Sequence, residues 1–239
     1  MLKNETTNEY RLIFELLNDN TYSVVSYDGK PVNLIIPSVY NNLPVTNVGD
    51  SAFFGCNSLT SVTIPDSVTS IDYCAFALCR ALKEVTIGSS LTHVDSEAFT
   101  SCDLLTSVNV KSIDAWCGIT FGNVNANPLF FAKNLYLNGE PVKELIISDK
   151  VKKIHDYAFE NCQSITSAVI GNSVITIGEY AFHKCTSLTD LTIGNSVINI
   201  KDYAFASCDS LTEVTLPKSL TNLSKNAFSY CALLKSIKK

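Results

Sequence analysis

The sequence predicts an α/β solenoid, a rod of short stacked coils, and three observations carry this prediction. The dipeptide Ala-Phe recurs seven times, and within each block of repeats its successive copies are 23 residues apart. A cysteine follows each of these phenylalanines by three residues, and a leucine or isoleucine follows each cysteine by three more. A fixed period of about 20 to 50 residues is typical of proteins in which each repeat packs on its neighbour.

The repeat unit contains two segments with the pattern of short strands. In residues 59–64 apolar and polar side chains alternate, as they do in a strand with one buried side. Residues 65–67 favour a turn, and residues 68–71 form a second short apolar segment. We call the two segments strand one and strand two. A single unit cannot bury its apolar side, so we expect each strand to pair in parallel with its counterpart 23 residues away.

The rest of the unit has the spacing of a short helix. Behind Asp72, apolar residues stand at intervals of three and four up to Cys79. We therefore expect one or two helical turns to close each coil.

The complete unit reads Ala-Phe-x-x-Cys-x-x-Leu-x-x-Val-x-Ile-Pro/Gly-x-x-Val-x-x-Ile, and it resembles the BspA-like, or Treponema-type, leucine-rich repeat. The resemblance covers roughly residues 45 to 111 and 143 to 239. It implies a right-handed, curved leucine-rich-repeat solenoid with short parallel strands. Members of this family are typically surface proteins of host-associated microbes, and the better-known ones bind matrix proteins or other cells. The resemblance thus implies a role in cell adhesion, by analogy of fold.

We expect one continuous domain with four parts: an N-terminal capping hairpin at 1–44, leucine-rich repeats at 45–111, an irregular inserted repeat at 112–142 and further repeats at 143–239. Two alternating segments around residues 18–20 predict the hairpin, which would cover the exposed end of the first coil. The step from Phe99 to Phe159 is 60 residues, two periods plus fourteen, and this excess defines the insert. Inside it, Asn138 and Gly139 favour a second hairpin.

The nine cysteines are candidates for a redox or metal array, but the pattern favours a structural role. Seven of them occupy one repeat position. Free cysteine is among the most buried residue types, and zinc sites need four converging ligands at closer spacing. His93, His155 and His183 occupy different repeat positions, so they cannot meet in a cluster, and we expect all three at the surface. The sequence predicts reduced thiols in the core, no metal and no cofactor.

The sequence offers little for catalysis. Cys117, outside the cysteine series, is the best candidate nucleophile, but a catalytic thiol needs an adjacent base and the insert contains no histidine. Phosphate-binding glycine loops, zinc-protease motifs and serine elbows are absent from the sequence. We therefore predict a protein without enzymatic activity and without catalytic residues.

Composition and charge exclude further classes. A formal charge of -5, from 18 basic and 23 acidic residues, gives no overall basic footprint for nucleic acid, and we interpret the local group of Lys143, Lys150, Lys152 and Lys153 as a solvated surface. No apolar run approaches the roughly 20 residues that a membrane span requires, so we expect no membrane insertion. The first residues are polar and lack the apolar stretch of a signal peptide, which leaves a cytoplasmic location open, whereas the family resemblance favours the cell surface. We expect a monomer.

Residues that point outward from strand one form the candidate binding surface, which is rich in threonine and mildly acidic. Exposed strands favour threonine in any case, so β propensity and solubility are the alternative explanation of this composition. The candidate residues are Ser61, Thr63, Glu84, Thr86, Asn109, Glu144, Asp190, Thr192, Glu213 and Thr215. A second candidate is an aromatic patch in the insert, formed by Trp116, Phe130, Phe131 and Tyr136.

Two functions are consistent with this sequence. The first is an adhesin-like module that binds a protein partner, such as an extracellular matrix or cell-surface protein. The second is an intracellular structural scaffold that shares the repeat without the adhesin role. The partner itself cannot be read from the sequence.

Overall fold

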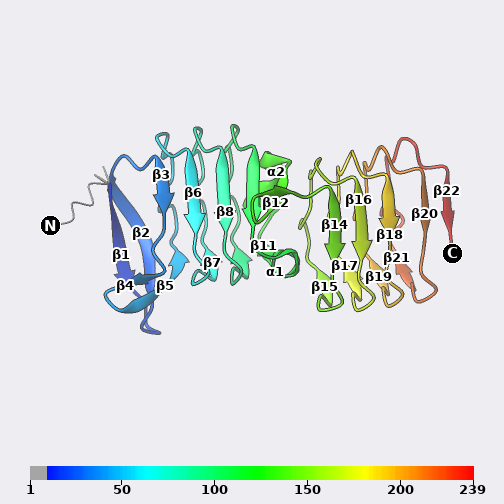
Figure 1. The fold of residues 1–239 in the computed structure, drawn as a ribbon, viewed down its shortest axis with the longest axis horizontal. Helices are drawn as coiled ribbons and strands as arrows, with labels where there is room; N and C mark the ends of the chain where they lie inside the picture. The colour runs from blue at the N-terminus through cyan, green and yellow to red at the C-terminus, as the bar shows by residue number, and fades with distance from the viewer. Residues whose placement is uncertain (1–9) are drawn as a thin grey trace.

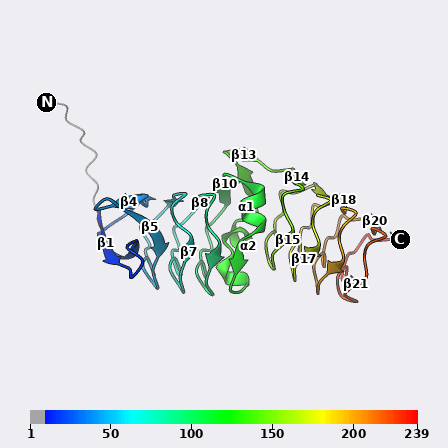
Figure 2. The ribbon, with the colours of Figure 1, turned by 90° about the horizontal axis from the view of Figure 1, so that it is seen from below.

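The structure, a computed structural model that describes residues 10–239, is an elongated stack of coils. Figure 1 shows the coils in chain order along the long axis, ending at β22 (Ser236–Lys238). In Figure 2 the strand-one strands lie along one long side of the stack and the strand-two strands along the other. One cluster of buried apolar residues runs between them. The prediction of a repeat solenoid is therefore confirmed. Residues 1–9 of the predicted cap lie outside the described residues.

Strand one forms three successive sheets rather than one. The first has the strand order β13-β12-β10-β8-β6-β3, the second β14-β16-β18 and the third β20-β22. All neighbours are parallel except β12 and β13, which form an antiparallel pair. The bounds are β3 (Asn33–Ile35), β6 (Ser61–Ile64), β8 (Glu84–Ile87), β10 (Ser107–Val110), β12 (Leu135–Leu137), β13 (Glu140–Pro141), β14 (Glu144–Ile147), β16 (Ser167–Ile170), β18 (Asp190–Thr192) and β20 (Glu213–Thr215).

Strand two forms two sheets on the opposite side. The first has the order β1-β2-β5-β7-β9-β11, with β4 paired to β5, and the second has the order β15-β17-β19-β21. The bounds are β1 (Tyr10–Leu16), β2 (Tyr22–Gly29), β4 (Val39–Tyr40), β5 (Leu43–Val48), β7 (Ser70–Ile71), β9 (His93–Val94), β11 (Thr120–Phe121), β15 (Lys153–Ile154), β17 (Thr176–Ile177), β19 (Asn199–Ile200) and β21 (Asn222–Leu223).

The register of these ladders equals the sequence period. Val62 lies opposite Val85, and Val85 lies opposite Val108. All three side chains are buried, whereas Ser61 and Glu84, one position earlier, point outward. Equivalent positions of successive coils therefore share one environment, which is the physical reason that the sequence repeats.

The segment that closes each coil is a pair of tight turns, so the predicted short helix is wrong. In the first six repeats, from Phe53 to Phe205, the residues two before and two after the phenylalanine have positive φ, for example Cys74 at 54° and Leu78 at 58° around Phe76. An α-helix needs φ near about −63° at every residue, so these two positions prevent one. The amide of Phe76 donates to Ala98 in the next coil, at 2.8 Å, instead of to its own turn. Bonds between coils thus replace the bonds that a helix would make.

Among the described residues, helices occur only in the insert. They are α1 (Ile113–Cys117), the 3-10 helix η1 (Val124–Ala126) and α2 (Pro128–Ala132). The chain then adds β12 to the first sheet and turns back through Asn138 and Gly139, whose φ angles are 52° and 88°. The predicted hairpin is confirmed. The insert interrupts both ladders, because β13 does not pair with β14 and β11 does not pair with β15.

At the N-terminal end, β1 and β2 form an antiparallel hairpin, and β2 pairs in parallel with β5. The ring of Tyr27 from β2 stacks on Phe53 at 5.5 Å, so the hairpin extends the aromatic column of the repeats. The strand-one ladder begins ahead of residue 45, because Leu34 of β3 already lies opposite Val62. The capping role of the hairpin stays a prediction.

The repeat phenylalanines form two columns of stacked rings, one on each side of the insert. In the first, Phe53, Phe76 and Phe99 have centroids 5.2 Å apart. In the second, the centroids of Phe159, Phe182, Phe205 and Phe228 are 5.0 to 5.2 Å apart. This spacing is close to the strand spacing of about 4.8 Å, since the same backbone ladder sets both.

These columns lead to a test of the repeat packing. Phe182 is fully buried between Phe159 and Phe205, so Phe182→Ala should lower the free energy of unfolding by ~3–5 kcal/mol through the cavity it leaves. Phe54→Ala is the matched control, because Phe54 is 52% exposed and its loss should cost within ~0.5 kcal/mol. Chemical denaturation measures both. Equal stability of Phe182→Ala and the wild type would contradict the packing.

Candidate functional site

The strand-one face is defined by the outward residues of β3, β6, β8, β10, β12, β14, β16, β18, β20 and β22. The predicted residues all lie on it with exposed or half-buried side chains: Ser61, Thr63, Glu84, Thr86, Asn109, Glu144, Asp190, Thr192, Glu213 and Thr215. Opposite pairs in the ladder, such as Thr63 and Thr86, belong to one column. The face therefore has two columns of side chains, one acidic and one rich in threonine.

The acidic column crosses three hydrogen-bonded sheets. Glu84, Glu144 and Glu213 lie on three different hydrogen-bonded sheets. Glu213 is also paired with Lys238 at 2.7 Å, and this lysine lowers the pKa of its carboxyl group, by a hydrogen bond and by its charge. The first break in the strand-one ladder lies at the insert. The second lies between β18 and β20, which are not paired, although the strand-two strands β19 and β21 of the same coils are paired.

Two aliphatic side chains in the threonine column were missed as candidates. Ile146 of β14 is 66% exposed, and Val169 of β16, its partner in the ladder, is 44% exposed. Their outward position in the repeat is visible in the sequence, but periodicity alone does not separate a tolerated exposed aliphatic from a recognition residue.

The insert does not present the predicted aromatic patch. Trp116 is 1% exposed, and its indole Nε1 donates to the carbonyl of Ala158 at 2.7 Å. Phe130 and Phe131 pack edge to face at 5.3 Å and are half-buried. Tyr136 stands beside Asn109 in the ladder and belongs to the strand-one face. Trp116 is thus a core residue, since an indole can be buried when its N–H has a partner.

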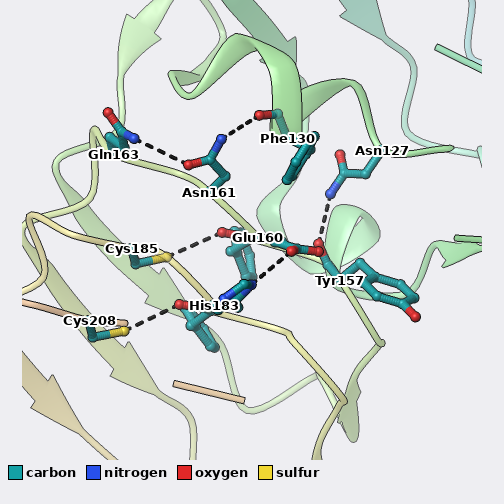
Figure 3. Close-up of polar contacts among 11 residues, drawn as sticks. Asn127, Phe130, Tyr157, Glu160, Asn161, Gln163, His183, Cys185 and Cys208 are labelled. Atoms are coloured by element: carbon teal, nitrogen blue, oxygen red, sulfur yellow. Dashed lines mark hydrogen bonds and ion pairs between the residues drawn. The ribbon is translucent and has the colours of Figure 1, made fainter. Parts of the chain in front are cut away.

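Side-chain amides join the insert to the coil that follows it, in place of the missing strand pairing (Figure 3). Asn127 donates to the carbonyl of Tyr157 at 2.8 Å, and Asn161 donates to the carbonyl of Phe130 at 2.7 Å. Asn127 is fully buried and also caps α2 by accepting from the amide of Leu129. Buried polar groups need such partners, so these bonds define where the two halves meet.

A buried ionisable pair lies next to this junction. Glu160 is 4% exposed, and its Oε1 lies 2.9 Å from Nδ1 of His183, one coil further on (Figure 3). The other carboxylate oxygen, Oε2, has no hydrogen-bond partner. The ring of Tyr180 packs edge-on against His183 at 5.2 Å. His183 is half-buried, as is His155, so the prediction of a surface position is wrong for these two histidines and is confirmed for the exposed His93. The sequence carried a signal, since both members directly follow a repeat phenylalanine.

The repeat cysteines are core residues, as predicted, and most also join neighbouring coils. The thiols of Cys79, Cys102, Cys185, Cys208 and Cys231 each donate to the carbonyl of a phenylalanine 26 residues earlier, at 3.1 to 3.3 Å. Burial raises the pKa of Cys102 to about 12 and that of Cys162 to about 11. A thiol held in its neutral form packs as a small apolar group and is a poor nucleophile.

Cys117, the candidate nucleophile, is also buried, and desolvation raises its pKa. Its carbonyl accepts the amide of His155, so this histidine meets the backbone of Cys117 rather than its thiol. Within residues 10–239, no group of three or more His, Cys, Asp or Glu side chains has an arrangement that could hold a metal ion. The helices of this part of the chain are also too short to cross a membrane.

Fold and surface together define a class: a leucine-rich-repeat solenoid with a 23-residue period and buried Phe and Cys columns. The chain belongs to the BspA-type leucine-rich repeat family, whose profile matches six copies over residues 33–136 and 130–239. The resemblance inferred from the repeat motif is confirmed. The family is in general a non-enzymatic protein-interaction fold.

Solved structures agree with this assignment at the level of the fold. A leucine-rich repeat protein of Treponema pallidum is 22% identical with a TM-score of 0.55, over 84% of this chain and 87% of the other. One from Bacteroides ovatus is 22% identical with a TM-score of 0.58, over 98% of this chain and 64% of the other. Comparison with curated proteins finds none with significant sequence similarity.

The pair of Glu160 and His183 can be tested by a double-mutant cycle. His183→Ala should lower the free energy of unfolding by ~1–3 kcal/mol, because it leaves the buried carboxylate without its only partner. Combined with Glu160→Ala, the cycle should give a coupling energy of ~1–3 kcal/mol. His93→Ala is the control at an exposed position, and it should change the free energy of unfolding by no more than ~0.5 kcal/mol. A coupling energy near zero would show that the two side chains do not stabilise each other.

The cysteines predict a specific thiol titration. Cys231 is half-buried, and Cys208 lowers its pKa by hydrogen bonding, whereas the other eight are buried. In the native protein a thiol reagent should therefore modify one cysteine rapidly, and Cys231→Ser should remove this phase. After denaturation without reductant, all nine should react. A denatured count clearly below nine would mean that the column is cross-linked.

Proposed function

We propose that this chain is a protein-binding module that takes its partner on the strand-one face and acts as an adhesin-like protein at the cell surface. The observation that carries the proposal is the face itself. Short outward side chains, Thr, Ser and Asn, stand in register along it, with acidic residues beside them and with Ile146 and Val169 exposed among them. Stacked repeats commonly bind through such extended surfaces.

The size of the face suits a protein partner. Ten strand-one strands, β3 to β22 without β13, follow one another along the stack. At about 4.8 Å per strand and about 3.3 Å per residue over four residues, they cover roughly 600 Å². A standard protein interface buries about 800 Å² on each partner, so a partner that also contacts one rim would reach this size.

The buried groups support binding rather than catalysis. Burial raises the pKa of the thiols of Cys102, Cys117 and Cys162, and the buried Glu160 pairs with His183. An enzyme needs reactive groups that converge on an accessible pocket. We therefore propose no catalytic residue and no cofactor, and we propose that the chain acts as a monomer.

The proposed location has its own test. Native cells are fractionated and probed with an antibody to the chain, with and without protease treatment of intact cells. Recovery in the surface fraction with loss on protease treatment is the expected result. Recovery in the cytosol alone would contradict the adhesin role and support the intracellular scaffold.

The proposed face is tested by charge reversal. The triple variant Glu84→Lys, Asp190→Lys and Glu213→Lys changes one exposed residue on each of the three sheets. Its stability should stay within roughly 1.5 kcal/mol of the wild type, since each exposed change costs about 0.5 kcal/mol or less. Its affinity for an immobilised matrix protein that binds the wild type should fall, because like charges across an interface can cost several kcal/mol.

The control variant has the same change of charge away from this face: Glu15→Lys, Asp28→Lys and Asp103→Lys, all at exposed positions. It should bind like the wild type. Surface plasmon resonance at low salt measures all three proteins. Wild-type affinity of the first variant would exclude the strand-one face as the binding site.

A further inference from the structure

β14 has an open strand edge in the middle of the stack. It pairs with β16 only, and the preceding sheet ends at β13. Figure 1 shows β14 after β12 along the stack, and Figure 2 shows β14 after β13. The hydrogen-bonded ladder is thus interrupted between two strands that lie on the same side of one molecule.

The backbone of β14 lacks a partner that regular coils have. The amide at the first position of strand one donates to the preceding coil, at 3.2 Å from Ser107 to Lys83 and at 3.2 Å from Ser167 to Lys143. Glu144 holds this position in β14, but β14 has no paired strand on that side. Hydrogen bonds of a parallel ladder alternate along the strand, so the amide of Ile146 points the same way. Two backbone donors therefore face the interruption.

A groove of about 430 Å³ lies between the hairpin and β14. Leu137 and Pro141 line it from the hairpin, and Ile146 lines it from β14. Glu140, Lys143 and Glu144 are exposed around it, and together they carry one net negative charge. The groove thus combines apolar walls, an open strand edge and a weakly acidic rim.

The geometry limits what can occupy this groove. The β12–β13 hairpin, the connector at residues 142–143, Ile113 of α1 and β14 enclose it, so an edge strand with a sheet behind it, such as that of a second copy, would collide with these segments. A single extended segment has no sheet behind it and is therefore the occupant that suits this open strand edge. Pro141 has no backbone N–H, so it cannot donate a ladder hydrogen bond from the edge of β13. This leaves β14 as the strand available for pairing. Extended peptides that add to an open sheet edge gain affinity from backbone bonds and specificity from alternate side chains.

We infer that the groove binds an extended segment of a partner protein, which pairs with β14 and carries alternating apolar and basic side chains. The apolar side chains pack on Leu137 and Ile146, and the basic ones lie near Glu140 and Glu144. This inference rests on the proposed protein-binding function and names the form of the ligand.

The test uses the complete chain and labelled peptides of alternating valine and lysine, about six residues long, the usual length of a strand. Fluorescence anisotropy should detect binding of this peptide at concentrations below about 1 mM. The same peptide with alternate residues N-methylated should bind at least about tenfold more weakly, because it lacks backbone donors and the room to approach. A valine and glutamate peptide should also bind more weakly, since its charges match those of the rim.

Two substitutions of Glu144 distinguish the contribution of its backbone amide to peptide binding from that of its charge. Glu144→Ala keeps the amide and should weaken binding only slightly, whereas Glu144→Pro removes the amide that faces the groove and should weaken it at least about tenfold. Both should fold, because proline is tolerated at strand edges. Independently of folding of the variants, the peptide should slow amide hydrogen exchange at Glu144 and Ile146 in the wild type, with no change at Asp190 and Thr192 of β18.

Four results would overturn the inference: no binding of the valine and lysine peptide, equal binding of the N-methylated peptide, equal binding by Glu144→Pro, or unchanged exchange in β14. The proposed function fails in a different way. The charge-reversal variant leaves β14 unchanged. If the peptide does not bind the groove but the proposed function holds, a folded matrix protein should still bind the wild type, and the substitutions at Glu84, Asp190 and Glu213 should still weaken that binding.

Discussion

The whole structure depends on one constraint, which is that each coil must close in register with the coil before it. Phenylalanine rings 5.0 to 5.2 Å apart can stack only if equivalent positions recur at the spacing of the strands. The turns obey the same constraint. From Phe53 to Phe205, left-handed residues on both sides of the phenylalanine direct its amide to the next coil, and in five repeats the thiol of the following cysteine donates back to the coil before. A side chain much larger than cysteine at this position would force the coils apart.

The insert shows what happens when the constraint is broken. No coil of normal length connects β12 to β14, so both ladders stop. The two halves are joined by Asn127, Asn161 and the indole of Trp116, together with single backbone bonds such as that from His155 to Cys117. These side chains donate to backbone carbonyls across the junction. The edge of β14 is not satisfied in this way, and it is there that the groove lies. The side-chain bonds at the junction and the candidate binding groove thus both result from the interruption of the ladders by the insert.

Positions that point outward from strand one are free of the stacking constraint. Threonine and serine suit exposed strands, but Ile146 and Val169 break this rule at adjacent positions of one column. The buried pair of Glu160 and His183 departs from the repeat in another way, since other coils have Ala206 or Thr100 at that position. Both departures lie in the coils directly after the insert, so the variable part of an otherwise uniform stack is concentrated around it.

The sequence by itself determined the parts of this protein that the period fixes: parallel coils, the buried columns, the outward strand-one residues and the hairpin at Asn138 and Gly139. These follow from local pattern, because every coil repeats the same environment. Only the tertiary structure decided the rest. The predicted helical turn at residues 72–79 became a pair of turns because alternate amides, those of Cys74, Phe76 and Leu78, bond to the next coil. Trp116 became a core residue because Ala158 accepts its N–H, and Glu84, Glu144 and Glu213 fell on separate sheets. Each of these outcomes depends on contacts between segments distant in sequence, which spacing along the chain does not encode.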